Sequence, residues 1–233
     1  MIVLVPGMLC DADLWSDLVE GLPGPVVHAA ITADSVGGMA EQVLSSVDGE
    51  FSLIGLSLGA IVGFEVARRA PQRLRSLHAL STNAGPPRPE QLAGWTELAE
   101  RTRAGQFAEV VAERILPAMF ADPSPPRARR ERFLAMADRI GPEVFRAQLA
   151  AQATRVGAFD AIAALPAPVQ VLCGDRDALC PPEFHRDIAR SAGGGEPHVL
   201  AGAGHLLPVE RPAVVGALLR GNLPARATSG GGA

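Results

Sequence analysis

The sequence of 233 residues contains no tyrosine and no lysine. All 21 of its lysine and arginine residues are arginine. A lysine is needed to form a Schiff base with a carbonyl substrate or with pyridoxal phosphate, and the phosphate-binding loop of P-loop NTPases also contains one. The sequence therefore excludes these three classes of enzyme.

Cysteine is scarce as well, with three residues at irregular positions, Cys10, Cys173 and Cys180. An odd number without a regular spacing is not typical of a disulfide framework, so we expect reduced thiols. The histidines and cysteines match no spacing typical of zinc sites. We therefore expect neither a metal nor a cofactor.

The sequence also lacks a large excess of either charge, since the formal net charge is −4 and the basic residues are interspersed with acidic ones. This balance gives no general attraction to nucleic acid or to an anionic membrane. No apolar run approaches the roughly 20 residues that span a bilayer, and Met1 leads directly into an apolar strand without the pattern of a secretory signal. We expect a soluble, cytoplasmic protein that acts on a small molecule, whereas its oligomeric state stays open.

Short apolar strands alternate with helical segments in both terminal parts of the chain, which is typical of βαβ units and a parallel sheet. The predicted strands cover residues 2–5, 26–30, 51–54, 74–80, 169–173 and 198–200. The helices predicted between and after them cover residues 13–20, about 34–47, 58–70, 182–191 and 208–220. The sequence thus predicts an α/β fold with helices on both faces of a mostly parallel, doubly wound sheet.

The alternation is interrupted between residues 85 and 160, where no strand is predicted. Four helices separated by proline and glycine are expected there, at residues 89–103, 106–120, 127–140 and 142–155. The simplest interpretation is a helical lid, 85–160, inserted into a core of residues 1–84 and 161–225. Residues 226–233 include no large apolar side chain to bury and are predicted to be disordered.

The motif Gly55-Leu56-Ser57-Leu58-Gly59 lies between the third predicted strand and its helix. A nucleophile elbow occupies this position in hydrolases: the sharp turn exposes a serine, and its flanking residues must be tiny. The motif alone is a weak signal, but its place between a strand and a helix strengthens it. Ser57 is the predicted nucleophile.

His205 follows the last predicted strand, in the bare loop Ala201-Gly202-Ala203-Gly204 that gives a histidine no packing role. The other four histidines have structural interpretations: His28, His78 and His198 fall in predicted strands, and His185 falls on a polar helix. His205 is the predicted general base.

Two carboxylates, Asp175 and Asp177, follow the strand that ends at Cys173. Since the carboxyl ends of parallel strands meet at one edge of a sheet, either side chain could hold the imidazole of His205. Asp175 is the tighter in the turn and could simply cap it, so we favour Asp177 as the acid that fixes the histidine tautomer.

A turn at Pro6-Gly7-Met8 follows the first strand. There the backbone N–H of Met8 could join that of Leu58 in an oxyanion hole. Only these two amides are assigned a role.

The chain order serine, aspartate, histidine and the motifs around these residues resemble the α/β-hydrolase superfamily, in particular small esterase-like members with a helical lid. The resemblance covers nearly the whole chain, with Pro6-Gly7 in place of the usual His-Gly. In the family the triad acid stands three residues after the turn glycine, which matches Gly174 and Asp177. The resemblance implies a sheet of about six strands here, without the family's N-terminal hairpin.

The resemblance implies a serine hydrolase that cleaves a carboxylic ester or related acyl bond through an acyl-enzyme. The same triad could serve an acyltransferase, a carbon–carbon bond hydrolase or a perhydrolase, and a hydrolase-fold binding protein with little turnover is a further alternative. A lid over the elbow presents apolar side chains to the substrate. We expect Trp95, Phe120 and Phe145 to bind a small, fairly apolar substrate.

Overall fold

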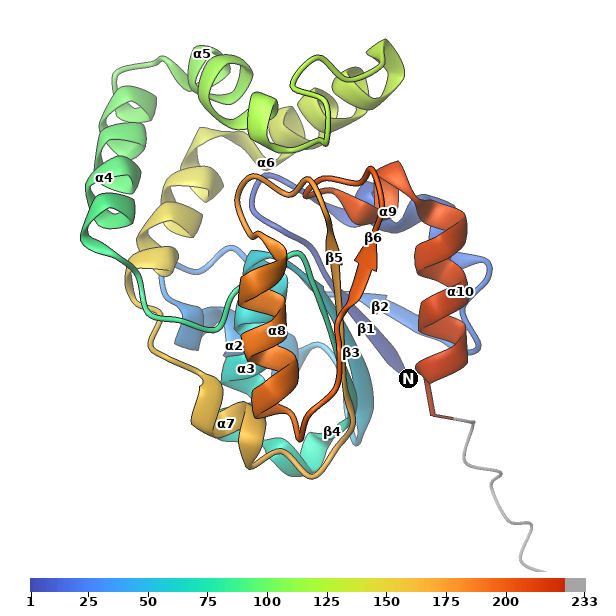
Figure 1. Ribbon diagram of the computed structural model, residues 1–233. Helices are drawn as coiled ribbons and strands as arrows, with labels where there is room; N and C mark the ends of the chain where they lie inside the picture. The colour runs from blue at the N-terminus through green and yellow to red at the C-terminus, as the bar shows by residue number, and fades with distance from the viewer. Residues whose placement is uncertain (225–233) are drawn as a thin grey trace, which may run out of the picture.

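The computed structural model describes residues 1–224 and contains one sheet of six parallel strands (Figure 1). The strands are β1 (Ile2–Val5), β2 (Val26–His28), β3 (Phe51–Leu56), β4 (Leu74–Leu80), β5 (Val169–Gly174) and β6 (His198–Leu200). Their order across the sheet is β2-β1-β3-β4-β5-β6. The predicted six-stranded parallel sheet is confirmed, and the predicted tail, 226–233, lies outside the described residues.

Side chains alternate between the two faces of the sheet, as the period of a strand requires. Val3 and Leu53 point to one face, whereas Leu4 and Ile54 point to the other, and all four are fully buried. The strands read as continuous apolar runs because helices cover both faces of the parallel sheet.

The helices of the core lie on both sides of this sheet (Figure 1). One face is covered by α2 (Val36–Ser45), α3 (Leu58–Arg69), α7 (Phe159–Ala163) and α8 (Pro182–Ser191). The other face is covered by α1 (Ser16–Val19), α9 (Leu207–Glu210) and α10 (Pro212–Asn222). Short 3₁₀ turns, Ala12–Trp15 and Pro71–Arg73, precede α1 and β4.

The segment between β4 and β5 contains no strand, as predicted. It consists of α4 (Pro89–Arg103), α5 (Phe107–Val110), a π turn (Val111–Ile115), a 3₁₀ turn (Leu116–Ala118), α6 (Arg127–Ala153) and finally α7. The first five of these elements, residues 89–153, are called the inserted helices below. Gly141 interrupts α6 with a φ of 73°, at the boundary predicted between two helices.

Three predicted helices differ in detail, in each case near a residue that alters the backbone. Pro117 ends the helix predicted for 106–120 early, because its ring removes a donor and forces the turns before it out of regular α geometry. Pro212 splits the helix predicted for 208–220, since the preceding Arg211 leaves the helical region at φ −137° and ψ 49°. The helix predicted for 13–20 begins as a 3₁₀ turn at Ala12, and the Asp11 side chain caps it by accepting the amide of Asp13.

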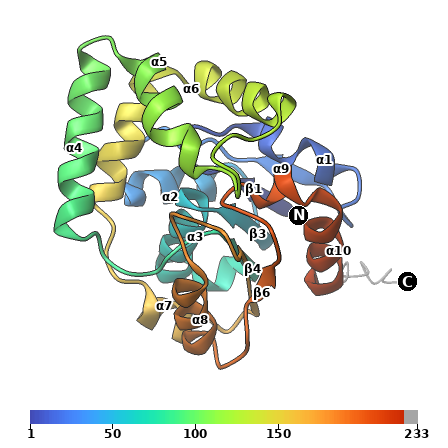
Figure 2. The same ribbon diagram turned by 45° about the horizontal axis from the view of Figure 1, so that its top comes forward.

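The inserted helices share a hydrophobic core with one face of the sheet. Phe133, Met136 and Leu149 of α6 belong to the same buried cluster as Leu56 of β3 and Leu172 of β5. Figure 2 shows α4, α5 and α6 above the carboxyl edge of the sheet. The insertion is therefore fixed to the core by apolar contacts as well as by its two ends.

No helix among residues 1–224 combines the length and the apolar character needed to cross a membrane.

The start of α3 lies against the end of β1 with no space between their backbones. A Cβ atom on Gly59 would come within 2.1 Å of the carbonyl oxygen of Val5, and one on Gly55 would come within 2.6 Å of the Gly59 backbone. Because both obstacles are backbone atoms, no rotamer change can relieve them. Glycine at both positions is therefore a steric requirement of the fold.

We predict that Gly59→Ala lowers the free energy of unfolding by about 3 kcal/mol or more, because two backbone segments must separate. Gly94→Ala is the matched control: Gly94 lies within α4 and a Cβ there meets nothing within 4 Å. Alanine should raise helix stability at that site by up to about 1 kcal/mol. Urea unfolding followed by circular dichroism measures both, and equal effects would contradict the steric argument.

Candidate active site

Ser57 stands at the sharp turn between β3 and α3 with a φ of 54° and a ψ of −113°. A positive φ is strained for a residue other than glycine and is typical of a nucleophile elbow. The turn is held by the Ser57 amide, which donates to the Leu80 carbonyl at 2.8 Å, and by the Thr82 hydroxyl, which donates to the Ser57 carbonyl at 3.0 Å. The motif thus has the backbone geometry that its glycines predict.

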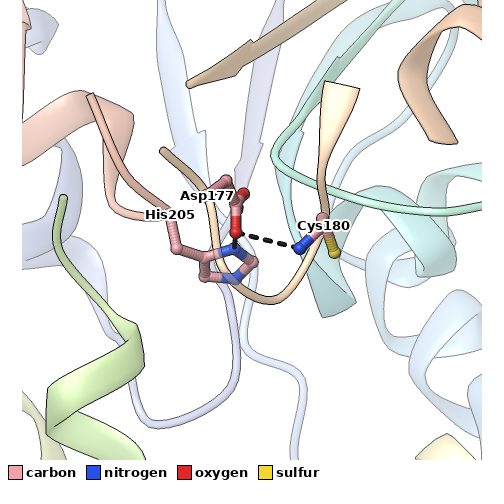
Figure 3. A group of neighbouring side chains, drawn as sticks. All are labelled: Asp177, Cys180 and His205. Atoms are coloured by element: carbon pink, nitrogen blue, oxygen red, sulfur yellow. Dashed lines mark hydrogen bonds and ion pairs between the residues drawn. The ribbon is translucent and has the colours of Figure 1, made fainter. Parts of the chain in front are cut away.

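Asp177 and His205 come from the loops after β5 and β6 and form a buried pair. Nδ1 of His205 lies 2.9 Å from Oδ2 and 3.0 Å from Oδ1 of Asp177, and the two residues expose only 3 % and 4 % of their surface (Figure 3). A proton on Nδ1 leaves Nε2 with a free lone pair, which is the tautomer that a general base needs.

The Asp177 carboxylate stays ionised in this position. Burial raises its pKa, but the charge interaction with His205 and hydrogen bonds from His205 and from the amides of Cys180 and Leu179 outweigh this effect. The net result is a pKa below the ordinary value of an aspartate. The negative charge needed to orient the imidazole is therefore present at neutral pH.

Asp175, the alternative acid, has a different partner. Its Oδ1 accepts the amide of Gly202 at 2.7 Å, and this bond joins the loop after β5 to the loop after β6. Its side chain thus braces the turn that leads to His205.

A buried carboxylate that the sequence analysis overlooked, Glu210, holds the histidine loop. Its Oε2 accepts the amide of Gly204 at 2.7 Å, and its Oε1 accepts the amide of Ala121 at 3.0 Å. A Cβ on Gly204 would meet the backbone of Phe120 at 2.4 Å, and the Leu206 amide donates to the Met119 carbonyl at 3.0 Å. The loop that joins the 3₁₀ turn Leu116–Ala118 to α6, in the middle of the insertion, is therefore bonded directly to the residues on either side of His205. The available signal in the sequence was an acid directly after the apolar run Leu206-Leu207-Pro208-Val209.

The turn after β1 is held by α6. Leu9 has a φ of 61°, and its amide donates to Oε1 of the buried Gln148 at 3.0 Å. The same Gln148 amide group donates to the Ile31 carbonyl at 3.2 Å. Gly7 lies beside the elbow, where a Cβ would come within 3.5 Å of the Ser57 Cβ. This arrangement places the Met8 segment next to Ser57.

A cavity of about 240 Å³ opens over Ser57 and is closed above by the inserted helices. His205, Gly7 and Met8 line it, together with Trp95, Leu98, Ile115 and Met119 from the inserted helices. Larger depressions occur on the outer surface, at α2 and α3 and between α4 and α6, but they contain neither Ser57 nor His205.

Of the three aromatic residues predicted to bind substrate, Trp95 alone lines this cavity. Phe120 packs edge-on against Phe133 with ring centroids 6.4 Å apart, and Phe145 packs against Phe107 at 5.8 Å. Both rings fill the interior of the inserted helices and lie outside the cavity lining. An apolar residue at helical spacing packs equally well on either side of a helix layer. The sequence therefore could not distinguish residues that line the cavity from residues that pack between the helices.

His185 is a structural residue, but it is buried in the core and not on a polar surface. Its Nε2 accepts the amide of Thr82 at 2.8 Å, and Nδ1 lies 3.2 Å from the Pro181 carbonyl. Burial lowers its pKa to about 4. The neutral ring therefore anchors the end of β4, next to the elbow.

Asp177, Cys180 and His205 offer ligand atoms within 4.8 Å of one another, so they could in principle hold a metal ion (Figure 3). Burial and the nearby Asp177 charge raise the pKa of the Cys180 thiol, whereas a metal binds the thiolate. The Asp177 carboxylate is already occupied by His205 and two amides. The donor set fits a hydrogen-bonded acid–base pair better than a metal, and the absence of a metal stays a prediction. The three cysteines are buried and form no disulfide among the described residues.

A family model for the alpha/beta hydrolase family matches residues 2–218. The chain belongs to this family. No curated protein sequence matches it significantly.

Solved structures of this hydrolase fold resemble the chain over nearly its whole length. A malate-bound thermophilic esterase from Thermogutta terrifontis is 28 % identical, with a TM-score of 0.82, 94 % of this chain and 88 % of the other being covered. A hydrolase from Pseudomonas aeruginosa is 24 % identical, with a TM-score of 0.82 and coverages of 96 % and 89 %. The enol-lactonase from Burkholderia xenovorans is 19 % identical, with a TM-score of 0.79 and coverages of 94 % and 88 %. The last two likenesses show the fold alone.

We predict that Asp177→Asn lowers kcat on the order of 10⁴-fold, because the amide would hold His205 in the wrong tautomer. Asp175→Asn should lower it far less, since it only weakens the bond to Gly202. Both variants are assayed on an activated ester at pH 7, with circular dichroism as the test of folding. The reverse ranking would make Asp175 the acid partner of His205.

Glu210→Gln should lower kcat about ten- to a hundredfold with little change in KM. One of the two backbone N–H groups that Glu210 accepts would then face the side-chain NH₂ donor, and the His205 loop would shift. Glu131→Gln is the control, since Glu131 forms an exposed ion pair with Arg127 on α6. Steady-state kinetics and thermal unfolding are measured for both. A loss of thermal stability with unchanged kcat would show that Glu210 has no role in positioning the histidine.

Proposed function

We propose that this hydrolase cleaves a carboxylic ester or a related acyl bond of a small substrate through an acyl-enzyme. Ser57 is the nucleophile, His205 the general base and Asp177 the orienting acid. The observation that carries the proposal is the Asp177–His205 pair at 2.9 Å, whose histidine lines the same small cavity as the strained Ser57.

The chemistry follows from these positions. Oγ of Ser57 attacks the acyl carbon while Nε2 of His205 takes its proton, and the new oxyanion accepts hydrogen bonds from the amides of Met8 and Leu58. Protonated His205 then gives the proton to the leaving alcohol. A water molecule, activated by the same histidine, attacks the acyl-enzyme and releases the acid with Ser57 regenerated.

The inserted helices act in this proposal as the lid, within residues 85–160. They close the cavity with Trp95, Leu98 and Met119, and apolar walls that exclude water strengthen the hydrogen bonds to the oxyanion. The described residues include no hydrogen bond between the Ser57 hydroxyl and the His205 ring. Such bonds are often long in free enzymes and shorten when substrate binds.

Ser57→Ala should reduce the hydrolysis of 4-nitrophenyl acetate to below about a thousandth of the wild-type kcat without unfolding the protein. A fluorophosphonate probe should label the wild type and spare the variant. Activity above a tenth of wild type in Ser57→Ala would refute the nucleophile. A folded wild type that neither turns over the ester nor reacts with the probe would instead indicate a binding protein of this fold.

A further inference from the structure

Arg155 follows the last turn of α6 and places a buried guanidinium in the cavity over Ser57. The residue is 6 % exposed. Its Nη1 donates to Oε1 of Gln152 at 3.1 Å, and its Nη2 donates to Oε1 of Gln91 at 2.9 Å. Its Cζ lies 5.2 Å from the centre of the Trp95 ring. All four residues line the cavity, so the cation stands in its wall, between the cavity and the outer depression at α2 and α3, which Arg155 also lines.

The positive charge of Arg155 has no acidic partner among residues 1–224. Both of its hydrogen-bond acceptors are neutral amides, and its Nε is buried without any partner. The residues that line the cavity include no aspartate and no glutamate. Arg114 is the other arginine of the lining, and it forms an ion pair with Glu97 at 2.8 Å.

A buried guanidinium without a counter-ion is unfavourable, because removal from water costs far more than neutral hydrogen bonds return. A guanidinium offers five N–H donors and keeps its proton in proteins. Two donors are used in the hydrogen bonds to Gln91 and Gln152. The Trp95 ring beneath Cζ and the two glutamines hold the guanidinium in place, so its remaining donors are already oriented. This arrangement is typical of a site for a planar anion.

We propose that Arg155 binds a carboxylate of the substrate, so that the esters cleaved at Ser57 are short and carry a second, ionised carboxyl group. The inference rests on the proposed function of Ser57. A carboxylate matches the flat fork of one guanidinium, whereas a phosphate dianion would leave one charge unbalanced because Arg114 is already paired. The cavity volume of about 240 Å³ limits the chain between the ester and the carboxylate to a few carbon atoms.

Matched pairs of esters test the preference for an anion, because an isopropyl group has nearly the shape of a carboxylate. Monomethyl succinate and methyl 4-methylpentanoate place the group on the acyl side. Acetoxyacetate and isobutyl acetate place it on the alcohol side. In one of the two pairs the wild type should prefer the anionic ester in kcat/KM by about ten- to a hundredfold, the range of a charge-assisted hydrogen bond. The pair that shows the preference identifies the side of the ester that faces Arg155.

Arg155→Met should remove this preference, because it should lower the kcat/KM of the anionic ester about ten- to a hundredfold more than that of its neutral partner. Arg155→Lys should restore part of it, because the charge returns without the planar fork. Arg103→Met is the matched control: Arg103 is exposed on α4, so its removal should leave the preference intact. Circular dichroism confirms that each variant is folded, and Arg155→Lys keeps the test informative if Arg155→Met unfolds.

Direct binding separates this inference from the proposed function. Calorimetric titration of Ser57→Ala with succinate and with glycolate, the acidic products of the two anionic esters, should detect binding of one of them. That binding should disappear when Arg155→Met is added. Arg155-dependent binding in a wild type without esterase activity would support the anion site and refute the proposed function. Esterase activity with no anionic preference and no binding of either acid would overturn the role of Arg155 alone.

Discussion

The contact between the first turn of α3 and the end of β1 determines how the elbow at Ser57 lies against the turn after β1. Gly59 lies so close to the Val5 carbonyl that no side chain fits between them. This contact brings the elbow beside the turn at Gly7, at the point where the strand order reverses between β1 and β3. Ligand sites of open parallel sheets lie at such reversals. Ser57 and the turn at Gly7 are therefore adjacent because the two backbones touch.

Most buried polar side chains around this point have hydrogen-bond partners that suit their charge. His185 anchors the end of β4 as a neutral ring, and Glu210 satisfies amides from two loops. Asp177 is balanced by its histidine and by two backbone donors. Arg155 is the exception in the cavity wall, where its donors are only partly used. Buried polar groups are normally satisfied, so a group left unsatisfied in a site points to the ligand.

The sheet and the elbow could be predicted from the sequence because their signals are local. Apolar strands bounded by Pro6-Gly7 or by Pro71, and glycines around Ser57, require only the neighbouring residues. The juxtaposition of Asp177 and His205 could be expected because strand ends share one edge. Glu210 and Arg155 depend on contacts with residues about 90 and 60 positions away, at Ala121 and Gln91, which no local pattern contains. The positions of Phe120 and Phe145 outside the cavity could not be predicted for a related reason, because the inner and outer faces of a helix layer are equally apolar.

The two bonds of Glu210 have a consequence for the way in which substrate reaches the cavity. The chain segment at Ala121 is tied to the histidine loop, so swinging the whole insertion outward would break the bond from the Ala121 amide to the buried Glu210 carboxylate and disturb the loop that carries His205. Displacing α4, which carries Trp95 and Gln91 over the cavity, leaves both bonds intact. Exchange of substrate and product is thus favoured along the α4 side. An exchange along this side would leave the Asp177–His205 pair assembled.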